Sequence, residues 1–301
     1  MECIGVIGGI AADVEGQPFG ILRPADSNPG TVEVSHGGVG RNIAENLARM
    51  GGNRVLFCSV RGDDELGRAA SESLAQAGAD ISGVHVIPDC RTAIYMSILD
   101  NDGEMVLAVS DMSVLERLTP ELVDRLLPLL SDASVIVLDA NLPVQTLEHC
   151  AHVFADRKIF VDPVSVEKAK RIRSILPACT ALKPNRIEAE QLVGFPIRSE
   201  RDLVEAGQFF LDQGVRMVFI SLGSDGLFYM EQSGRGLLAA EVIDDMSSVT
   251  GAGDAASAAI ADGLARGLTA DEIARQANRA AGLTLRAQQR VHPEISSFRL
   301  G

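Results

Sequence analysis

The sequence predicts an α/β protein in which helices cover both faces of a mostly parallel sheet. Short runs rich in β-branched residues alternate with segments of helical periodicity, and no linker, low-complexity tract or repeat divides the 301 residues. Runs this apolar are typical of parallel strands that are buried on both faces. Strand and helix in turn therefore predict a doubly wound domain of three layers, α/β/α. The candidate strands are Cys3–Ile10, Val55–Val60, Val135–Asp139, Ile159–Asp162 and Met217–Ser221.

Two segments break this pattern and predict a second, smaller sheet. Side chains alternate along Ala93–Val109, and the turn Asn101-Asp102-Gly103 inside it is a strong hairpin signal. Thr31–Ser35 is a further short strand. A small antiparallel sheet inserted into a parallel α/β domain commonly covers a substrate cleft. We therefore expect one domain over residues 1–301, with lid segments at roughly 13–36 and 90–110.

Two helix starts can be placed from their capping residues. Thr119 precedes Pro120, which is typical of an N-cap followed by proline at the first helical position. Thr269 with Glu272 predicts a capping box at the start of a late helix.

Composition excludes several classes of partner. The formal net charge is −14, whereas a protein that binds the phosphate backbone of a nucleic acid needs a basic face. Aromatic residues make up 4% of the chain and Trp is absent, which disfavours a stacking surface for single strands. We therefore expect no nucleic acid and no anionic membrane as a main partner.

The cysteines and the N-terminus predict a cytoplasmic protein. The five cysteines are scattered without a CxxC spacing, which is typical of reduced thiols in a cytosolic protein. The N-terminus lacks the basic region of a signal peptide, and no apolar run approaches the ~20 residues of a membrane span.

The segment Gly251-Ala252-Gly253-Asp254 carries the clearest chemical signal. Glycines directly before a helix let the backbone approach a phosphate, and the amide N–H groups then point at it from the positive end of the helix dipole. A carboxylate beside that anion hole, Asp254, can accept a proton from an attacking hydroxyl. An ordinary glycine-rich turn with an Asp at a helix start would show the same residues.

A second glycine segment, Gly37-Gly38-Val39-Gly40-Arg41-Asn42, leads into a helix. It matches a dinucleotide-binding loop poorly, because Asn42 stands near the position of the last glycine. Glycines that let a polyol lie against the backbone, with the Asn42 amide bonding its hydroxyls, explain the segment better.

Two further segments favour a metal and a nucleotide. Asn185 and Glu188 are three residues apart at a helix start, so they share a face and suit a hydrated Mg²⁺ with its phosphates. An Asn N-cap with Glu at the third helical position explains this spacing equally well. Ser221–Gly226 follows a strong strand, and such a glycine-rich strand end either binds a nucleotide or is a plain turn.

The order of these segments resembles that of the ribokinase/PfkB family of carbohydrate kinases. Four segments follow one another as in that family, over nearly the whole chain: Gly37–Asn42, Asn185–Glu188, Ser221–Gly226 and Gly251–Asp254. The paired Gly-Gly-x-Gly-x-Asn and Gly-Ala-Gly-Asp motifs are specific to it. The resemblance implies a ribokinase-like three-layer fold with a small β-sheet lid, and transfer of a phosphoryl group from ATP to an alcohol with Mg²⁺ as cofactor.

The resemblance also implies a role for each matching residue. Asp254 is the expected catalytic base, and Gly251, Ala252 and Gly253 form the expected anion hole. Asn185 and Glu188 would arrange Mg²⁺ through water or phosphate. The expected substrate contacts are Asp13, Gly37, Gly38, Asn42, Asn141 and Asp254, and the expected ATP contacts are Asn185, Ser221, Gly223, Gly226, Gly253 and Asn278.

Within the family, several stretches are similar to the pseudouridine kinases, and some of them lie in the expected lid. They are residues 25–30, 37–46, 99–105, 161–165 and 182–190. The implied reaction converts pseudouridine and ATP to pseudouridine 5′-phosphate and ADP.

Three positions depart from the family pattern. Ala11 stands where members usually have Asn, which removes one expected ribose contact. Ser248 and Val249 replace the Asp and Thr that open the Asp-Thr-x-Gly-Ala-Gly-Asp motif. Because the first of these positions helps to bind a monovalent cation in related kinases, the changes argue against activation by K⁺.

Other functions stay open from the sequence. The substrate could be another nucleoside, such as adenosine or inosine, or a free sugar such as ribose or fructose. An NAD-dependent oxidoreductase is disfavoured, because no acidic ribose ligand lies ~20 residues beyond a well-formed glycine loop. A sugar- or nucleoside-sensing module without catalysis is disfavoured by Asp254 with its intact glycine loop. Related kinases often dimerise through the lid, so a homodimer is expected.

Overall fold

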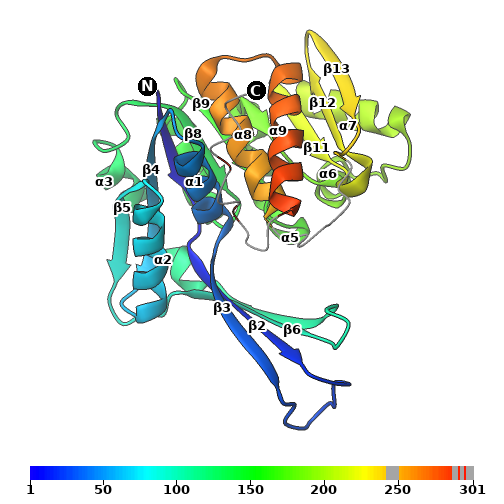
Figure 1. Ribbon diagram of the computed structural model, residues 1–301. Helices are drawn as coiled ribbons and strands as arrows, with labels where there is room; N and C mark the ends of the chain where they lie inside the picture. Colours follow the sequence, from blue (N-terminus) through cyan, green and yellow to red (C-terminus); the bar gives the residue numbers. More distant parts are fainter. Residues whose placement is uncertain (242–250, 287–290, 292–294, 296–301) are drawn as a thin grey trace.

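The computed structural model describes residues 1–241, 251–286, 291 and 295, and these residues form two β-sheets (Figure 1). The larger sheet has nine strands in the order β13-β12-β11-β10-β9-β8-β1-β4-β5. Neighbours from β11 to β5 are parallel, and β12 and β13 add an antiparallel edge. The strands are β1 (Cys3–Ile7), β4 (Arg54–Gly62), β5 (Asp80–Ile87), β8 (Ala133–Asp139), β9 (Lys158–Asp162), β10 (Ala181–Leu182), β11 (Met217–Ser221), β12 (Leu227–Glu231) and β13 (Gly234–Leu238).

Helices cover both faces of this sheet, which confirms the predicted three-layer α/β/α fold. Successive side chains of a strand point to opposite faces, so Ile4 and Val6 of β1 join one buried cluster and Ile7 joins the other. The first cluster is completed by α1 (Val39–Met50), α2 (Glu65–Gln76), α8 (Ala252–Arg266) and α9 (Ala270–Leu285). The second is completed by α3 (Pro120–Leu126), α4 (Val144–Val153), α5 (Val166–Ala169), α6 (Arg186–Val193) and α7 (Glu200–Asp212). Short 3₁₀ helices are η1 (Ser113–Arg117), η2 (Lys170–Ala178) and η3 (Gly223–Asp225).

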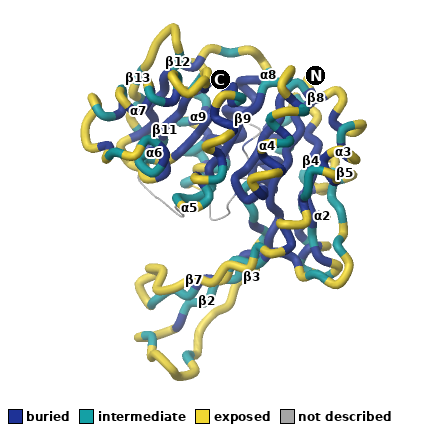
Figure 2. The backbone as a smooth tube through the Cα atoms, turned by 180° about the vertical axis from the view of Figure 1, so that it is seen from behind, coloured by how far each residue is buried: buried dark blue, intermediate teal, exposed yellow. Residues whose placement is uncertain are grey.

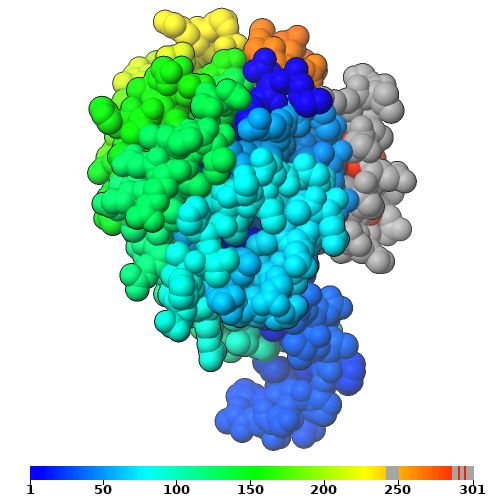
Figure 3. Space-filling model, turned by 90° about the vertical axis from the view of Figure 1, so that its left-hand side faces the viewer, coloured from blue at the N-terminus to red at the C-terminus, as the bar shows by residue number. Residues whose placement is uncertain are grey.

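The smaller sheet projects from the body as a separate lobe (Figures 1 and 3). Its strands are β2 (Ala11–Pro18), β3 (Gly30–Gly37), β6 (Ala93–Leu99) and β7 (Met105–Asp111), in the order β3-β2-β6-β7. The antiparallel pair β6–β7 confirms the predicted hairpin. Much of this lobe is exposed, in contrast to the body (Figure 2).

The first predicted strand was too long. It ends at Ile7 instead of Ile10, because Gly8 and Gly9 turn the chain away and Gly9 N–H donates to the Asp139 carboxylate instead of a strand partner. The chain then enters the small sheet as β2, whose sequence AADVEGQP mixes polar residues with Gly and Pro and gave no strand signal. Strands β5 and β13 were missed for the same reason, and β10 has only two residues. Strand β12, LFYME, was also missed although it is apolar and as long as β11.

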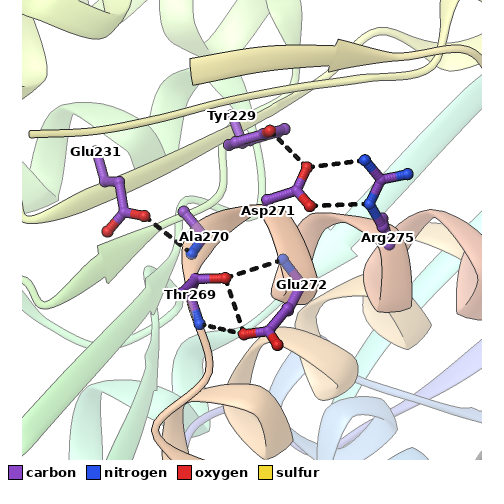
Figure 4. A network of polar contacts seen from close by, with 7 residues as sticks. All are labelled: Tyr229, Glu231, Thr269, Ala270, Asp271, Glu272 and Arg275. Carbon is purple, nitrogen blue, oxygen red and sulfur yellow. Dashed lines mark hydrogen bonds and ion pairs between the residues drawn. The ribbon is translucent and has the colours of Figure 1, made fainter. Parts of the chain in front are cut away.

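The two predicted helix starts differ in their chemistry. Thr269 caps α9 with a full capping box, in which its hydroxyl and backbone N–H both bond Glu272, as Figure 4 shows. Glu231 of β12 accepts the N–H of Ala270, which ties this helix start to the sheet. Thr119 is the N-cap of α3, but its side chain makes no capping bond. None of the helices in the described part of the chain is long and apolar enough to cross a membrane.

Candidate active site

The start of α8 meets the start of α1. Gly251, the N-cap of α8, has φ = +89°, a left-handed conformation that favours glycine. Asp254 is the third residue of the helix, where backbone N–H groups have no partner within the helix and can face an anion. Asn42 Nδ2 donates a hydrogen bond to Asp254 Oδ2 at 2.8 Å, although 212 positions separate the two residues. The structure thus brings the two predicted glycine segments together.

Gly37 and Gly38 are required by close approach of neighbouring groups. A Cβ on Gly37 would overlap the Asp13 carboxylate, and one on Gly38 would overlap the carbonyl oxygen of Gly9. Gly38 also has φ = +96°. Asp13 is buried on β2, opposite Ser35 of β3. The predicted substrate residues therefore gather where the small sheet joins the N-terminus of α1.

Asp139 connects the junction of the small sheet and α1 to the large sheet through hydrogen bonds. It ends β8 and is fully buried, and its Oδ2 accepts the N–H groups of Gly9 and Gly40, each at 2.8 Å. Its Oδ1 accepts the N–H of Asn141 at 3.0 Å. Burial raises the pKa of Asp139, and the three backbone donors oppose that rise. One carboxylate therefore sets the positions of the turn after β1, the start of α1 and Asn141.

Asn141, a predicted substrate contact, lies against a lysine that the sequence did not single out. Lys168 Nζ donates to Asn141 Oδ1 at 2.5 Å. Burial lowers the pKa of Lys168, while the nearby Asp139 carboxylate raises it. The pair places an amide and an ammonium group beside the Asp139 network.

A buried lysine, Lys183, lies near three carboxylates. Lys183 directly follows β10, and its Nζ lies 3.4 Å from Oδ2 of Asp162, which ends β9. Ser257 of α8 donates to the same carboxylate oxygen at 2.7 Å. Burial disfavours the charged amine, but Asp162, Glu188 and Asp254 outweigh it and hold the pKa of Lys183 above its ordinary value. Lys183 is thus a cation fixed beneath the start of α8.

Among the described residues, few atoms lie against Gly253 beside this lysine. A Cβ on Gly253 would meet only Lys183 Nζ within 4 Å among the described residues, at 3.8 Å, an ordinary contact. Gly253 is also exposed, whereas Lys183 is buried. Packing within the described residues therefore does not require a glycine here, and an anion could approach both the backbone and Nζ.

Most of the predicted ATP residues form a second group at the same carboxyl edge of the sheet, toward β12 and β13. Asn185 bridges to Ser221 at the end of β11, and η3 follows with Gly223. Gly226 has φ = +103°, and a Cβ there would overlap the carbonyl oxygen of Leu238.

Asn278 of α9 reaches the same place. Its Nδ2 donates to the Ala239 carbonyl oxygen at 2.8 Å, and Ala239 lies against Gly226. The structure therefore brings Asn278 and Gly226 close together.

Comparison with known proteins identifies the family. The pfkB family carbohydrate kinase pattern matches residues 1–294. The chain belongs to the pfkB family of carbohydrate kinases. Members of this family are ATP-dependent phosphotransferases.

Similar proteins include kinases of nucleosides and of ribose. The chain is 34% identical over 291 residues to the pseudouridine kinase of Escherichia coli, with 97% of this chain and 93% of the relative covered. It is 26% identical to the guanosine-inosine kinase of Exiguobacterium acetylicum, with 90% of each chain covered. The crystal structure of ribokinase from Thermotoga maritima superposes with a TM-score of 0.87 over all of both chains at 20% identity, and shows the shared fold.

A magnesium ion is expected in a kinase of this family, and the residues present fit one that is held partly by phosphates. Asn185 Oδ1 accepts the N–H of Glu188, and Glu188 Oε2 accepts the N–H of Asn185, so the capping alternative is present. Burial, with the nearby Asp162, raises the pKa of Glu188. No group of three or more His, Cys, Asp or Glu side chains in the described part of the chain could hold a metal by itself. Mg²⁺ typically takes one or two carboxylates together with phosphates and water, which this arrangement allows.

Besides Lys168, the sequence analysis gave no role to three polar residues of this candidate site that lie at strand ends. Asp139, Asp162 and Lys183 each end or directly follow a parallel strand, and the carboxyl ends of such strands are where α/β proteins bind ligands. The place of Asp139 and Asp162 at the carboxyl ends of predicted strands was the sequence feature that could have revealed them. Ser248 and Val249, on which the potassium argument depends, lie outside the described residues.

Proposed function

We propose that the chain transfers the γ-phosphoryl group of ATP to the 5′-hydroxyl of pseudouridine, with Asp254 as the general base. The observation that carries the proposal is the contact between Asn42 and Asp254 at 2.8 Å, because it joins a polyol-type glycine loop to the carboxylate at a helix start. The 34% identity to a pseudouridine kinase over 97% of the chain supports the choice of substrate.

Each group of site residues has its own role in the proposed phosphoryl transfer. Asp13 and Asn42 hold the ribose hydroxyls, and Asn141 with Lys168 offers further polar contacts. Asp254 accepts the proton of the attacking hydroxyl while the N–H groups at the start of α8 stabilise negative charge on the phosphoryl group. Ser221, Gly223, Gly226 and Asn278 line the adenosine side. Asn185 and Glu188 would hold Mg²⁺ through water or phosphate, and the ion would supply positive charge to the ATP phosphates.

The first experiment measures ADP release with ATP and Mg²⁺ over a panel of pseudouridine, uridine, cytidine, adenosine, inosine, guanosine, ribose and fructose. We expect strong turnover of pseudouridine and little of uridine, because a buried group that bonds the free ring N–H of pseudouridine is left unpaired by uridine. Turnover of another member alone would replace the substrate and keep the kinase. Binding of a nucleoside or sugar without any turnover would favour a sensing protein instead.

The small sheet supports a homodimer as the assembly. Its strands align Val34, Val14, Met96 and Val109 in one row, and the next row on the same face holds Val32, Ile98 and Leu107. Val34, Val109 and Val32 are 57%, 59% and 72% exposed. The opposite face carries polar residues that include Asp13, Glu15 and Ser97. An exposed apolar face of this kind marks an interaction surface, and we assign it to a second copy of the chain.

A further inference from the structure

A series of polar contacts runs along α1 to Asp254. Arg41 Nη1 pairs with Glu45 Oε2 at 2.6 Å and donates to Asn42 Oδ1 at 3.1 Å. Asn42 Nδ2 in turn donates to Asp254 Oδ2 at 2.8 Å. We propose that Arg41 is a positioning residue, whose guanidinium fixes the orientation of the Asn42 amide and thereby the position of the Asp254 carboxylate. The inference rests on the proposed function, in which Asp254 is the base.

The hydrogen-bonding capacity of the three side chains allows one arrangement. A guanidinium only donates and an ionised carboxylate only accepts, whereas an amide has a donor end and an acceptor end. With Arg41 on one side, the amide oxygen of Asn42 must face it, and the NH₂ group then faces Asp254. A reversed amide would place its oxygen against the carboxylate and its NH₂ against the guanidinium. Arg41 therefore reinforces the amide orientation that the Asp254 carboxylate favours, and it holds the NH₂ group of Asn42 toward the base.

Glu45 makes the contact between Arg41 and Asn42 geometrically possible. Adjacent residues of a helix normally point in different directions, so their side chains do not meet. Glu45 lies one turn further along and is buried, and it holds the guanidinium of Arg41 close to the helix. Arg49 donates from Nε to the other oxygen of Glu45 at 2.8 Å, which fixes that carboxylate from the far side.

Stability alone does not explain these buried charges. Replacing a buried ion pair with well-packed apolar residues is often neutral or stabilising. Arg41 is 3% exposed, and its Nε has no hydrogen-bond partner among the described residues, so the pair is not fully compensated. A role in orienting Asn42 gives a reason for a charged residue at this position.

The test compares two arginines that share Glu45. Arg41→Met should lower kcat by about 10–100-fold with a smaller change in KM for ATP, since a small displacement of a catalytic group has effects of that order. Arg49→Met should lower kcat much less than Arg41→Met, because Arg49 bonds Glu45 and lies about two helical turns from Asn42. Equal kcat for Arg41→Met and wild type would overturn the inference.

A double-mutant cycle separates positioning from a merely structural role. If Arg41 acts through the Asn42 amide, Arg41→Met should have little further effect on kcat once Asn42→Ala is present. Losses that multiply in the double variant would show that Arg41 acts by another route and would overturn the proposal.

A second variant without either buried charge tests the proposal in case Arg41→Met does not fold. Arg41→Met with Glu45→Met removes both buried charges, so its thermal unfolding should stay close to that of the wild type while kcat stays low. Wild-type kcat in this folded variant would contradict the proposal. Wild-type protein that transfers no phosphoryl group to any substrate of the panel would instead defeat the proposed function, and this inference with it.

Discussion

The large sheet and the small sheet use their surfaces in different ways. Both faces of the large sheet are buried under helices, and its polar side chains gather where strands end, as at Asp139 and Asp162. The small sheet has one polar face and one apolar face, and residues such as Val34 on the apolar face are exposed. In the proposed function, the body holds the reacting groups in fixed positions, whereas the small sheet contacts the substrate and a second copy of the chain.

The largest expected effect tests the chemistry of the body. Asp254→Asn removes the base but keeps the shape of the side chain, so kcat should fall by roughly 10²–10⁴-fold with little change in nucleotide binding. Steady-state ADP release checks this. Asp202→Asn makes the same change at the third position of α7, where the carboxylate only caps the helix, and should leave kcat unchanged. Near-normal turnover by Asp254→Asn would remove it from the mechanism.

The next effect tests the buried electrostatics beneath α8. Lys183→Met leaves the carboxylates of Asp162 and Glu188 without their cation, and removing one partner of a buried pair costs about 3–5 kcal/mol of unfolding free energy. Urea unfolding at pH 7 measures the loss. Lys170→Met removes an exposed ammonium that pairs with Glu167 at 2.7 Å, so it should cost about 0–1 kcal/mol.

The loss in Lys183→Met should also depend on pH. Burial already raises the pKa of Glu188 and Lys183 opposes that rise, so removing the lysine raises it further. The folded state then binds protons at a pH where the unfolded state does not, and its stability rises as the pH falls. The deficit relative to wild type should therefore be smaller at pH 5 than at pH 7. An equal deficit at both values would mean that Lys183 stabilises the fold by packing and not by charge.

The contrast between the two sheets also explains what the sequence could predict. Strands of the body such as β8 and β11 are apolar through their centres because they are buried on both faces, and a run of that kind is visible in sequence. The hairpin β6–β7 was visible through its turn residues. Strand β2 was not, because its side chains are half-buried and its pairing with β3 and β6 depends on chain segments far away in sequence.

The same limit on prediction from sequence applies to the candidate site. The glycine segments could be found from their residue pattern, since a positive φ or a close approach admits little else, as at Gly38 and Gly251. The contacts that join them could not, because the pairing of Asn42 with Asp254 and of Lys183 with Asp162 is decided by tertiary packing. The local sequence indicates the backbone conformation of each segment, but it does not indicate which other segment that segment contacts.

The smallest expected effect concerns assembly through the small sheet. Val109 lies on the apolar face of β7, and Ala108 beside it lies on the polar face. Val109→Lys should shift the protein from dimer to monomer, because it places an ammonium group in the apolar contact between two copies, whereas Ala108→Lys should leave the dimer intact. Light scattering after size-exclusion chromatography measures both variants at several concentrations. A wild-type protein that stays monomeric at every concentration, or a dimer that both variants preserve, would assign the exposed apolar face to another partner and leave the chemistry of the body untouched.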